Sequence, residues 1–227
     1  MNIAIIPARG GSKRIPKKNI KLFLEKPIIA YSIEAAINSK LFDEVIVSTD
    51  DDEIANIAVK FGAKIPFTRS EKNSSDYATT FDVIGEVIEF YKQKNSHFEN
   101  ICCIYACAPF VTSEKLITSY KLLIEKEYDS VFPVVNFGSP IQRALKIKEN
   151  KASFFQDEFV LTRSQDLEKS YHDVGQFYWM NSGKIIAKKQ ILTDNTGVII
   201  VSELESQDID NEIDWKLAEL KFNLMNK

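Results

Sequence analysis

Short apolar segments alternate with amphipathic ones over the first 135 residues of the chain. The apolar segments have the length and composition of strands and occupy residues 2–8, 44–48, 63–67, 101–105 and 130–135. Between them, the spacing of apolar residues predicts helices over 28–37, 53–61, 79–91 and 113–125. Strands that alternate with helices are typical of the α/β class, so we predict a mostly parallel, doubly wound, Rossmann-like sheet.

The alternation stops after Asn136. Residues 137–177 show little helical period, and two apolar stretches at 144–147 and 152–155 predict an antiparallel hairpin. Farther on, we expect strands at 177–180 and 198–201, a short helix at 183–189 and a terminal helix at 212–226. Because no repeat or linker divides the chain, we predict one domain over residues 1–227 with an insertion at about 137–177.

The loop after the first strand is suited to anions. Gly10 and Gly11 allow a tight turn that exposes backbone N–H groups. Positions 9–21 carry no acidic residue and six cations: Arg9, Lys13, Arg14, Lys17, Lys18 and Lys21. Many such clusters are merely solvated, but this one follows a strand at the edge where open α/β sheets bind ligands. It matches neither the Walker A motif nor the dinucleotide fingerprint and therefore predicts another mode of phosphate binding.

The composition is that of a globular protein, with 44% hydrophobic and 27% charged residues. A net charge of -3 argues against nucleic acid as a partner. No apolar run approaches the length of a membrane span and no leader is evident, so we expect a cytoplasmic location and no membrane partner. The three cysteines, Cys102, Cys103 and Cys107, are expected to be thiols.

The run from Ile6 to Lys13, with Pro16, Lys18 and Asn19, resembles the signature of the cytidylyltransferases that activate nonulosonic acids, the CMP-sialic acid synthetase family. Further matching segments, at 48–50, 208–210 and the C-terminus, extend the resemblance over nearly the whole chain. It implies a nucleotidyltransferase domain in which CTP reacts with a sugar acid, with Mg²⁺ as cofactor and diphosphate as the second product. The segments that most resemble members acting on pseudaminic acid are 165–167, 171–173 and 175–179. Sialic acid, legionaminic acid and Kdo are the alternatives within the family.

Nucleotidyl transfer needs an anion cradle, a divalent metal and a pocket that aligns the attacking oxygen, and it needs no nucleophilic side chain. By resemblance, Arg9, Lys13 and Lys18 are triphosphate contacts. With Asp210 they are the candidate catalytic residues. The candidate CTP contacts are Arg9, Gly10, Gly11, Ser12, Lys13, Lys18, Asn19, Arg69, Asp76, Thr80 and Ala108. For Thr79 and Thr80, a helix cap is the alternative role.

Asp208 and Asp210 are the candidate metal ligands. In an extended segment, residues two apart share a face, so both carboxylates can reach one Mg²⁺. A role for Asp210 as the cap of the terminal helix is the alternative. The rival acidic cluster at 50–52 is explained by its place at a helix start.

A nonulosonic acid carries a carboxylate and amide substituents, which favour Arg and polar groups beside aromatic rings. Arg143 or Arg163 is expected to pair with that carboxylate, within one chain or across the homodimer that the family resemblance implies. Tyr105 stands where sialic acid enzymes usually carry Gln, which argues for another sugar. His172 is a general base or a structural residue bonded to a nearby Asp. The candidate sugar contacts are Tyr105, Gln142, Arg143, Arg163, Gln165, His172, Gln176, Phe177 and Tyr178.

Two other functional classes were weighed. An RNA-binding module would scatter cationic and aromatic patches over its surface, whereas the positive charge here is focused on one loop. A catalytically silent nucleotide-binding homologue is disfavoured because Arg9, Lys13, Asp208 and Asp210 are all present.

Overall fold

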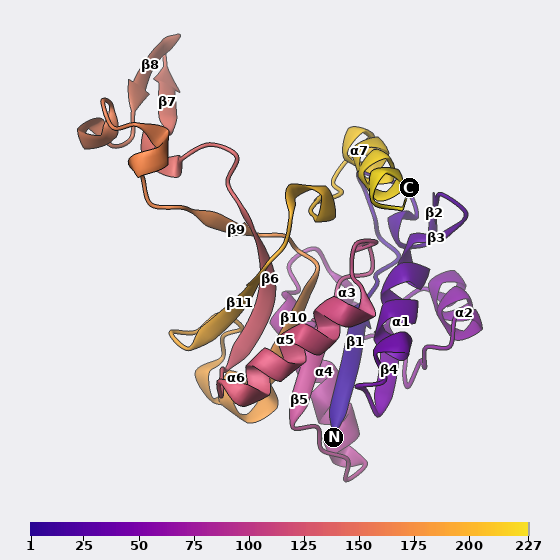
Figure 1. Ribbon diagram of the computed structural model, residues 1–227. Helices are drawn as coiled ribbons and strands as arrows, with labels where there is room; N and C mark the ends of the chain where they lie inside the picture. The colour runs from indigo at the N-terminus through magenta and orange to yellow at the C-terminus, as the bar shows by residue number, and fades with distance from the viewer. Residues whose placement is uncertain (227) are drawn as a thin grey trace.

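A mixed sheet of seven strands forms the centre of the computed structural model, which describes residues 1–226 (Figure 1). The strands are β1 (Asn2–Pro7), β4 (Glu44–Ser48), β5 (Asn100–Ile104), β6 (Ser130–Asn136), β9 (Tyr171–Asp173), β10 (Phe177–Asn181) and β11 (Thr196–Ile200). Their order is β11-β6-β10-β5-β1-β4, and β9 pairs with the carboxyl end of β6. Five strands are mutually parallel, whereas β9 and β10 are antiparallel to their neighbours.

Helices cover both faces of this sheet. They are α1 (Ile28–Ser39), α2 (Asp52–Lys60), α3 (Glu71–Ser74), α4 (Thr80–Gln93), α5 (Ser113–Glu125), α6 (Ser182–Lys188) and α7 (Glu212–Met225). Buried residues of α1, α2 and α5 pack on one face, and those of α4 and α6 on the other. Helix α7 packs instead against the small β2 (Leu22–Phe23) and β3 (Lys26–Pro27) hairpin beside the start of α1. Within residues 1–226, no helix has both the length and the apolar character needed to cross a bilayer.

The predicted α/β class and mostly parallel sheet are confirmed, and most element ends agree within two residues. Two details differ from the sequence prediction. Residues 63–67 do not form a strand, and only Lys64 makes an isolated bridge, to Ile46. Pro66 lacks the N–H that a longer ladder would need. The second difference is the reversed direction of β10, which the sequence pattern did not reveal because an apolar run has no orientation.

Residues 137–170 form an arm that stands away from the body of the protein, and β9 leads back from it to the sheet (Figure 1). The predicted hairpin is confirmed as β7 (Leu145–Lys148) and β8 (Lys151–Phe154). Its two-residue turn has φ of 50° at Glu149 and 62° at Asn150, as in the hairpin turns that match strand twist. Large apolar side chains of the arm are exposed, among them Leu145, Ile147, Phe155 and Leu161.

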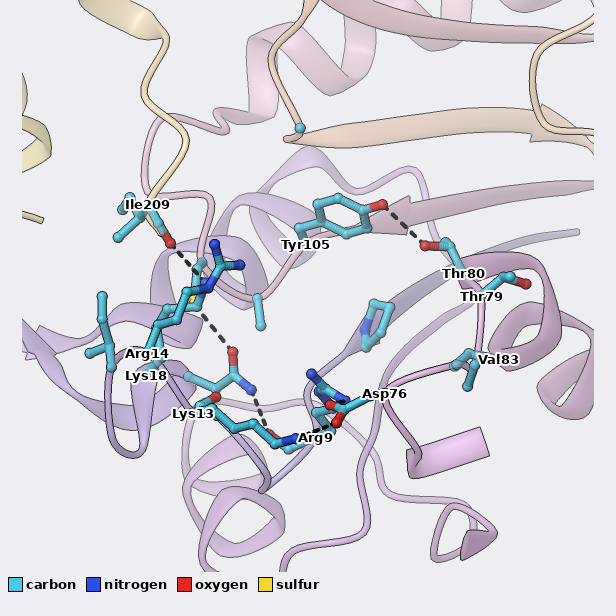
Figure 2. Close-up of a pocket in the computed structure, with 18 of the residues that line it drawn as sticks. Arg9, Lys13, Arg14, Lys18, Asp76, Thr79, Thr80, Val83, Tyr105 and Ile209 are labelled. Carbon is cyan, nitrogen blue, oxygen red and sulfur yellow. Dashed lines mark hydrogen bonds and ion pairs between the residues drawn. The ribbon is translucent and has the colours of Figure 1, made fainter. Parts of the chain in front are cut away.

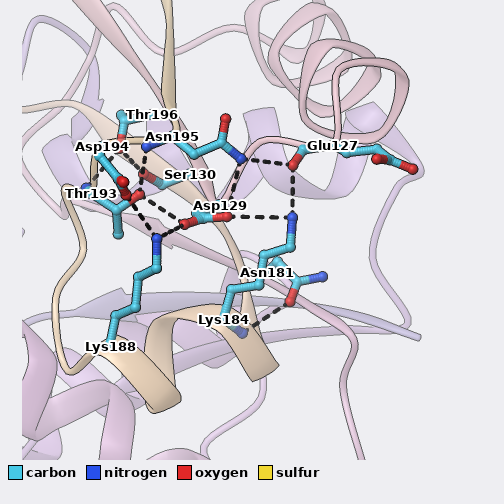
Figure 3. Close-up of polar contacts among 10 residues, drawn as sticks. All are labelled: Glu127, Asp129, Ser130, Asn181, Lys184, Lys188, Thr193, Asp194, Asn195 and Thr196. Atoms are coloured by element: carbon cyan, nitrogen blue, oxygen red, sulfur yellow. Dashed lines mark hydrogen bonds and ion pairs between the residues drawn. The ribbon is translucent and has the colours of Figure 1, made fainter.

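A polar cluster holds the sheet together at the amino end of β6 (Figure 3). Its centre is Asp129, whose side chain is only 4% exposed. The carboxylate accepts hydrogen bonds from Thr193 Oγ1 at 2.8 Å and Asn195 Nδ2 at 3.2 Å. It also pairs with Lys188 Nζ at 2.9 Å and Lys184 Nζ at 3.3 Å. These contacts, led by that with Lys188, lower the pKa of Asp129 well below its usual range. Every partner lies at the edge of the sheet opposite the arm, so the cluster is structural.

Candidate active site

A cavity of about 600 Å³ lies at the edge of the sheet where the parallel strands end (Figure 2). Its walls come from the loop after β1, the loop before α4, the end of β5 and the segment before α7. Nine of the predicted CTP and metal contacts line it: Arg9, Ser12, Lys13, Lys18, Asn19, Arg69, Asp76, Thr80 and Asp208. Four others do not: Gly10, Gly11, Ala108 and Asp210. The structure therefore brings together residues that are up to about 200 positions apart.

The loop after β1 is held in place from two sides. On one side, the Gly10 N–H donates to Asp50 Oδ1 at 3.0 Å. A Cβ atom on Gly10 would lie 2.8 Å from a carboxylate oxygen of Asp51, so only glycine permits this approach. On the other side, Asn19 Nδ2 donates to the Arg9 carbonyl at 2.9 Å and Asn19 Oδ1 accepts from the Cys107 thiol at 3.2 Å. The Asn19 amide, a predicted CTP contact, therefore also fixes the loop.

Asp76 lies between two of the predicted triphosphate contacts (Figure 2). Its carboxylate pairs with Arg9 Nη1 at 2.7 Å and with the Lys13 ammonium. Contact with Lys13, and then with Arg9, lowers the pKa of Asp76. The two cations thus already bind an anionic group, which shows that their geometry suits one. A phosphate that binds to both would have to displace Asp76.

The segment before α7 is joined to the basic loop by two contacts. Lys18 Nζ donates to the Ile209 carbonyl at 2.8 Å, and Arg14 Nη1 pairs with Asp210 Oδ2 at 2.7 Å. Ile209 is buried while Asp208 and Asp210 on either side are not, as expected for an extended segment. The predicted alternative role of Asp210 as a helix cap is wrong, because Asn211 caps α7 in a capping box with Asp214.

Two carboxylates beside a phosphate site suit Mg²⁺, which usually binds one or two protein carboxylates and completes its shell with substrate phosphates and water. Asp208 lines the cavity, and Asp210 lies beside it in the pair with Arg14. Among the described residues, no cluster of three or more Asp, Glu, His or Cys side chains could hold a metal alone. The donors present fit an ion that arrives with a nucleotide, and the metal role of both aspartates stays a prediction.

The segment between α2 and α4, which contains the short helix α3, forms the opposite wall. Arg69 is only 5% exposed, and its guanidinium donates to the Ser48 hydroxyl at 3.0 Å and to the Ser48 carbonyl. Burial lowers the pKa of Arg69. Thr79 caps α4 in a capping box with Asp82, so the alternative role as a cap applies to Thr79. Thr80 is left to line the cavity, with its Oγ1 3.1 Å from the Tyr105 hydroxyl.

Comparison with known proteins defines the family. The family model described as Cytidylyltransferase matches residues 3–205. The chain belongs to the cytidylyltransferase family. It is 41% identical to pseudaminic acid cytidylyltransferase of Campylobacter jejuni, over 98% of this chain and 97% of that protein. It is 33% identical to CMP-N,N'-diacetyllegionaminic acid synthase of Legionella pneumophila, over 96% of this chain and 94% of that protein.

The fold of this cytidylyltransferase is also that of a solved relative. CMP:2-keto-3-deoxy-manno-octonic acid synthetase complexed with CTP superposes with a TM-score of 0.70, over 99% of this chain and 98% of the other. At 17% identity this likeness concerns the fold alone. Together with the family, it confirms the predicted class of protein, an α/β nucleotidyltransferase.

The predicted sugar contacts of the cytidylyltransferase are scattered. Only Tyr105, half-buried, lines the cavity, and burial raises the pKa of its hydroxyl. Four lie on the arm and are not brought to the cavity of their own chain: Gln142, Arg143, Arg163 and Gln165. His172 lies where the arm returns to the body. Its Nδ1 is 2.9 Å from the Asp173 carbonyl oxygen, and its ring packs on Phe137, which favours the structural alternative.

Three predicted sugar contacts at or just before the start of β10 do not line the cavity. Phe177 is fully buried among residues of α1 and α5, because that face of the sheet is covered. The Gln176 amide donates to the Glu205 carbonyl at 2.6 Å. The Tyr178 hydroxyl donates to Asp173 Oδ2 at 2.5 Å. The sequence showed an aromatic cluster but not which faces of β10 were covered, and none of these three side chains lines the cavity.

Several residues that line the cavity were not predicted as site residues from the sequence. They are Arg14, Asn73, Ser75, Ala78, Val83, Ala106, Cys107, Gly175 and Ile209. The polar composition of the loop at 69–78 was a usable signal for Asn73 and Ser75. For Cys107 and Gly175 the sequence holds no local signal. Gly175 reaches the cavity only because the reversed strand β10 begins beside it.

Proposed function

We propose that this cytidylyltransferase transfers the CMP group of CTP to pseudaminic acid, forming CMP-pseudaminic acid and diphosphate. The observation that carries the proposal is the cavity in which Arg9, Lys13 and Lys18 face Asp208. A cationic cradle beside a free carboxylate suits a triphosphate and its metal. The choice of sugar rests on the 41% identity with the C. jejuni enzyme over nearly the whole of both chains.

In the proposed reaction the anomeric hydroxyl of the sugar attacks the α-phosphorus of CTP. The new P–O bond forms as the bond to the β-phosphate oxygen breaks, diphosphate leaves with that electron pair, and the hydroxyl proton is released to water. Arg9 and Lys13 would exchange Asp76 for phosphate oxygens and stabilise the charge that develops on them. Mg²⁺ held by Asp208 and Asp210 would neutralise further charge on the phosphates.

The proposal extends to a homodimer in which the arm of one chain reaches the cavity of the other. The arm carries predicted sugar contacts, stands away from its own body and exposes large apolar side chains. In such a dimer Arg143 or Arg163 would bind the sugar carboxylate in trans. We further expect the enzyme to act in the cytoplasm. Its product would serve the glycosylation of surface structures such as flagellin, and a 30% identical relative in Campylobacter coli is named a flagellin modification protein.

The proposal is tested by diphosphate release from CTP with a panel of sugar acids: pseudaminic, sialic, legionaminic and Kdo. We expect turnover with pseudaminic acid and at least tenfold less with the others. Turnover with legionaminic acid alone would point instead to the function named for the L. pneumophila relative. Light scattering at assay concentration tests the dimer, and a monomer that is fully active would refute the proposed role of the arm.

A further inference from the structure

Asp173 is the last residue of β9 and stands where the arm rejoins the sheet. Its side chain makes two hydrogen bonds that have no part in the proposed reaction. Oδ1 accepts the Gly175 N–H at 2.7 Å, and Oδ2 accepts the Tyr178 hydroxyl at 2.5 Å. One carboxylate therefore binds both the backbone at Gly175 and the side chain of Tyr178.

The bond to Tyr178 leads to the cavity through one aromatic contact. Tyr178 is 8% exposed, and its ring lies edge-on to that of Tyr105, with centroids 5.6 Å apart and planes inclined by 62°. Tyr105 lines the cavity, and its hydroxyl is 3.1 Å from Thr80 Oγ1. A change in the direction of the Tyr178 ring would therefore move the Tyr105 ring that packs on it.

The bond to Gly175 reaches the same cavity through the backbone. Gly175 has φ of +61°, a conformation that other residues rarely adopt, and it lines the cavity. It lies between β9 and β10, which both pair with β6. Both oxygens of Asp173 thus act on the cavity wall, one through a ring and the other through the main chain.

This wall lies apart from the cations. Figure 2 shows Tyr105 and Thr80 on one side of the cavity, and Arg9, Lys13 and Asp76 on the other. A ligand whose phosphates bind the cations would leave Tyr105 to face the remaining part of the reactants. In the proposed function the remaining parts are the cytidine of CTP and the sugar acid, and Tyr105 is a predicted contact of the sugar acid.

We propose that Asp173 is a positioning residue that sets Tyr105 and Gly175 for binding of the sugar acid. The inference rests on the proposed function and adds a residue to it that touches neither substrate. It also gives Tyr178 a role, since its hydroxyl is turned to Asp173 and not to the ligand. Burial, and the contact with Asp173, raise the pKa of Tyr178, which agrees with a phenol that stays protonated and donates.

The test compares the wild type with Asp173→Ala, Asp173→Asn, Tyr178→Phe and the double variant Asp173→Ala/Tyr178→Phe. For each, KM is measured for pseudaminic acid and for CTP, together with the Kd for CTP by calorimetry. We expect Tyr178→Phe and Asp173→Ala to raise KM for the sugar about tenfold, the loss of one hydrogen bond to a charged group. The Kd for CTP should stay within about twofold. Asp173→Asn keeps one acceptor oxygen, so its KM for the sugar should lie between those of the wild type and Asp173→Ala.

The double variant separates positioning from general damage. If both residues act through the same contact, its effect on the sugar KM should be much less than the product of the single effects. Asp194→Asn, an exposed carboxylate at the opposite edge of the sheet, is the control for loss of charge. Tyr178→Phe keeps the buried ring, so it remains informative even if Asp173→Ala folds poorly.

Equal changes in the sugar KM and the CTP Kd, or no change in either, would overturn the inference. A wild type that turns over a different sugar acid would refute the proposed substrate instead. The same variants would then be measured with that acid, so the two failures are distinguishable.

Discussion

Replacing Asp129 by Asn tests how much the polar cluster at the amino end of β6 contributes to stability. The carboxylate accepts from Thr193 and Asn195 and pairs with Lys184 and Lys188, while its own side chain is 4% exposed. Asparagine keeps the shape and one acceptor oxygen, but its NH₂ group would face donors. The variant therefore removes charge-assisted bonds without creating a cavity.

The magnitude follows from the exposure of the partners. Breaking a buried pair costs about 3–5 kcal/mol when the remaining charge stays buried. Here the lysine side chains are 41% and 44% exposed, so water can solvate them after the change. We expect Asp129→Asn to lower the free energy of unfolding by about 2–3 kcal/mol. For a chain of this size, that corresponds to a fall in Tm of roughly 4–12 °C.

The pH dependence has a definite sign. The pKa of Asp129 is lower in the folded protein than its ordinary value of 3.8, so its stabilising effect is complete above that value. The effect is lost as the pH falls toward the folded pKa and the carboxylate is protonated. The difference in Tm between wild type and variant should be constant from about pH 5 to 8 and should shrink below about pH 4.

Scanning calorimetry from pH 3 to 8 measures this difference, with Asp194→Asn as the matched control. Asp194 pairs with the same Lys188 at 2.8 Å, but its side chain is 90% exposed, so its loss should leave Tm unchanged. CTP binding should be the same in all three proteins, since the cluster lies at the edge of the sheet opposite the cavity. If both variants lose stability equally, or if the difference in Tm is as large at pH 3 as at pH 7, the reasoning is refuted.

Three predictions concern the cavity. Lys18→Met should raise KM for CTP about 10- to 100-fold, because it removes a cation and its hydrogen bond to the Ile209 carbonyl. An unchanged KM would place the triphosphate elsewhere. Asp210→Asn should abolish turnover, and it should weaken Mn²⁺ binding as measured by electron paramagnetic resonance, while CTP binding weakens but stays detectable. An unaffected rate would remove Asp210 from the mechanism. Arg69→Met should reduce discrimination between CTP and UTP, and unaltered discrimination would show that another group reads the base.

The sequence by itself determined the elements and the nature of the first loop. Strand β1 is buried on both faces, and its apolar run showed this directly. The glycines and cations that follow were recognisable because turn chemistry and charge are properties of a few adjacent residues. The capped start of α4 and the two-residue turn of the arm are local in the same way.

Only the tertiary structure decided how distant segments meet. Arg9 and Asp76 are 67 positions apart, and Lys18 and Ile209 are 191 apart, yet each pair is in contact at the cavity. The aromatic run at the start of β10 suggested ligand contact, but the helices that cover the sheet bury it. Such pairings depend on the packing of whole elements against one another, and no local pattern of residues encodes them.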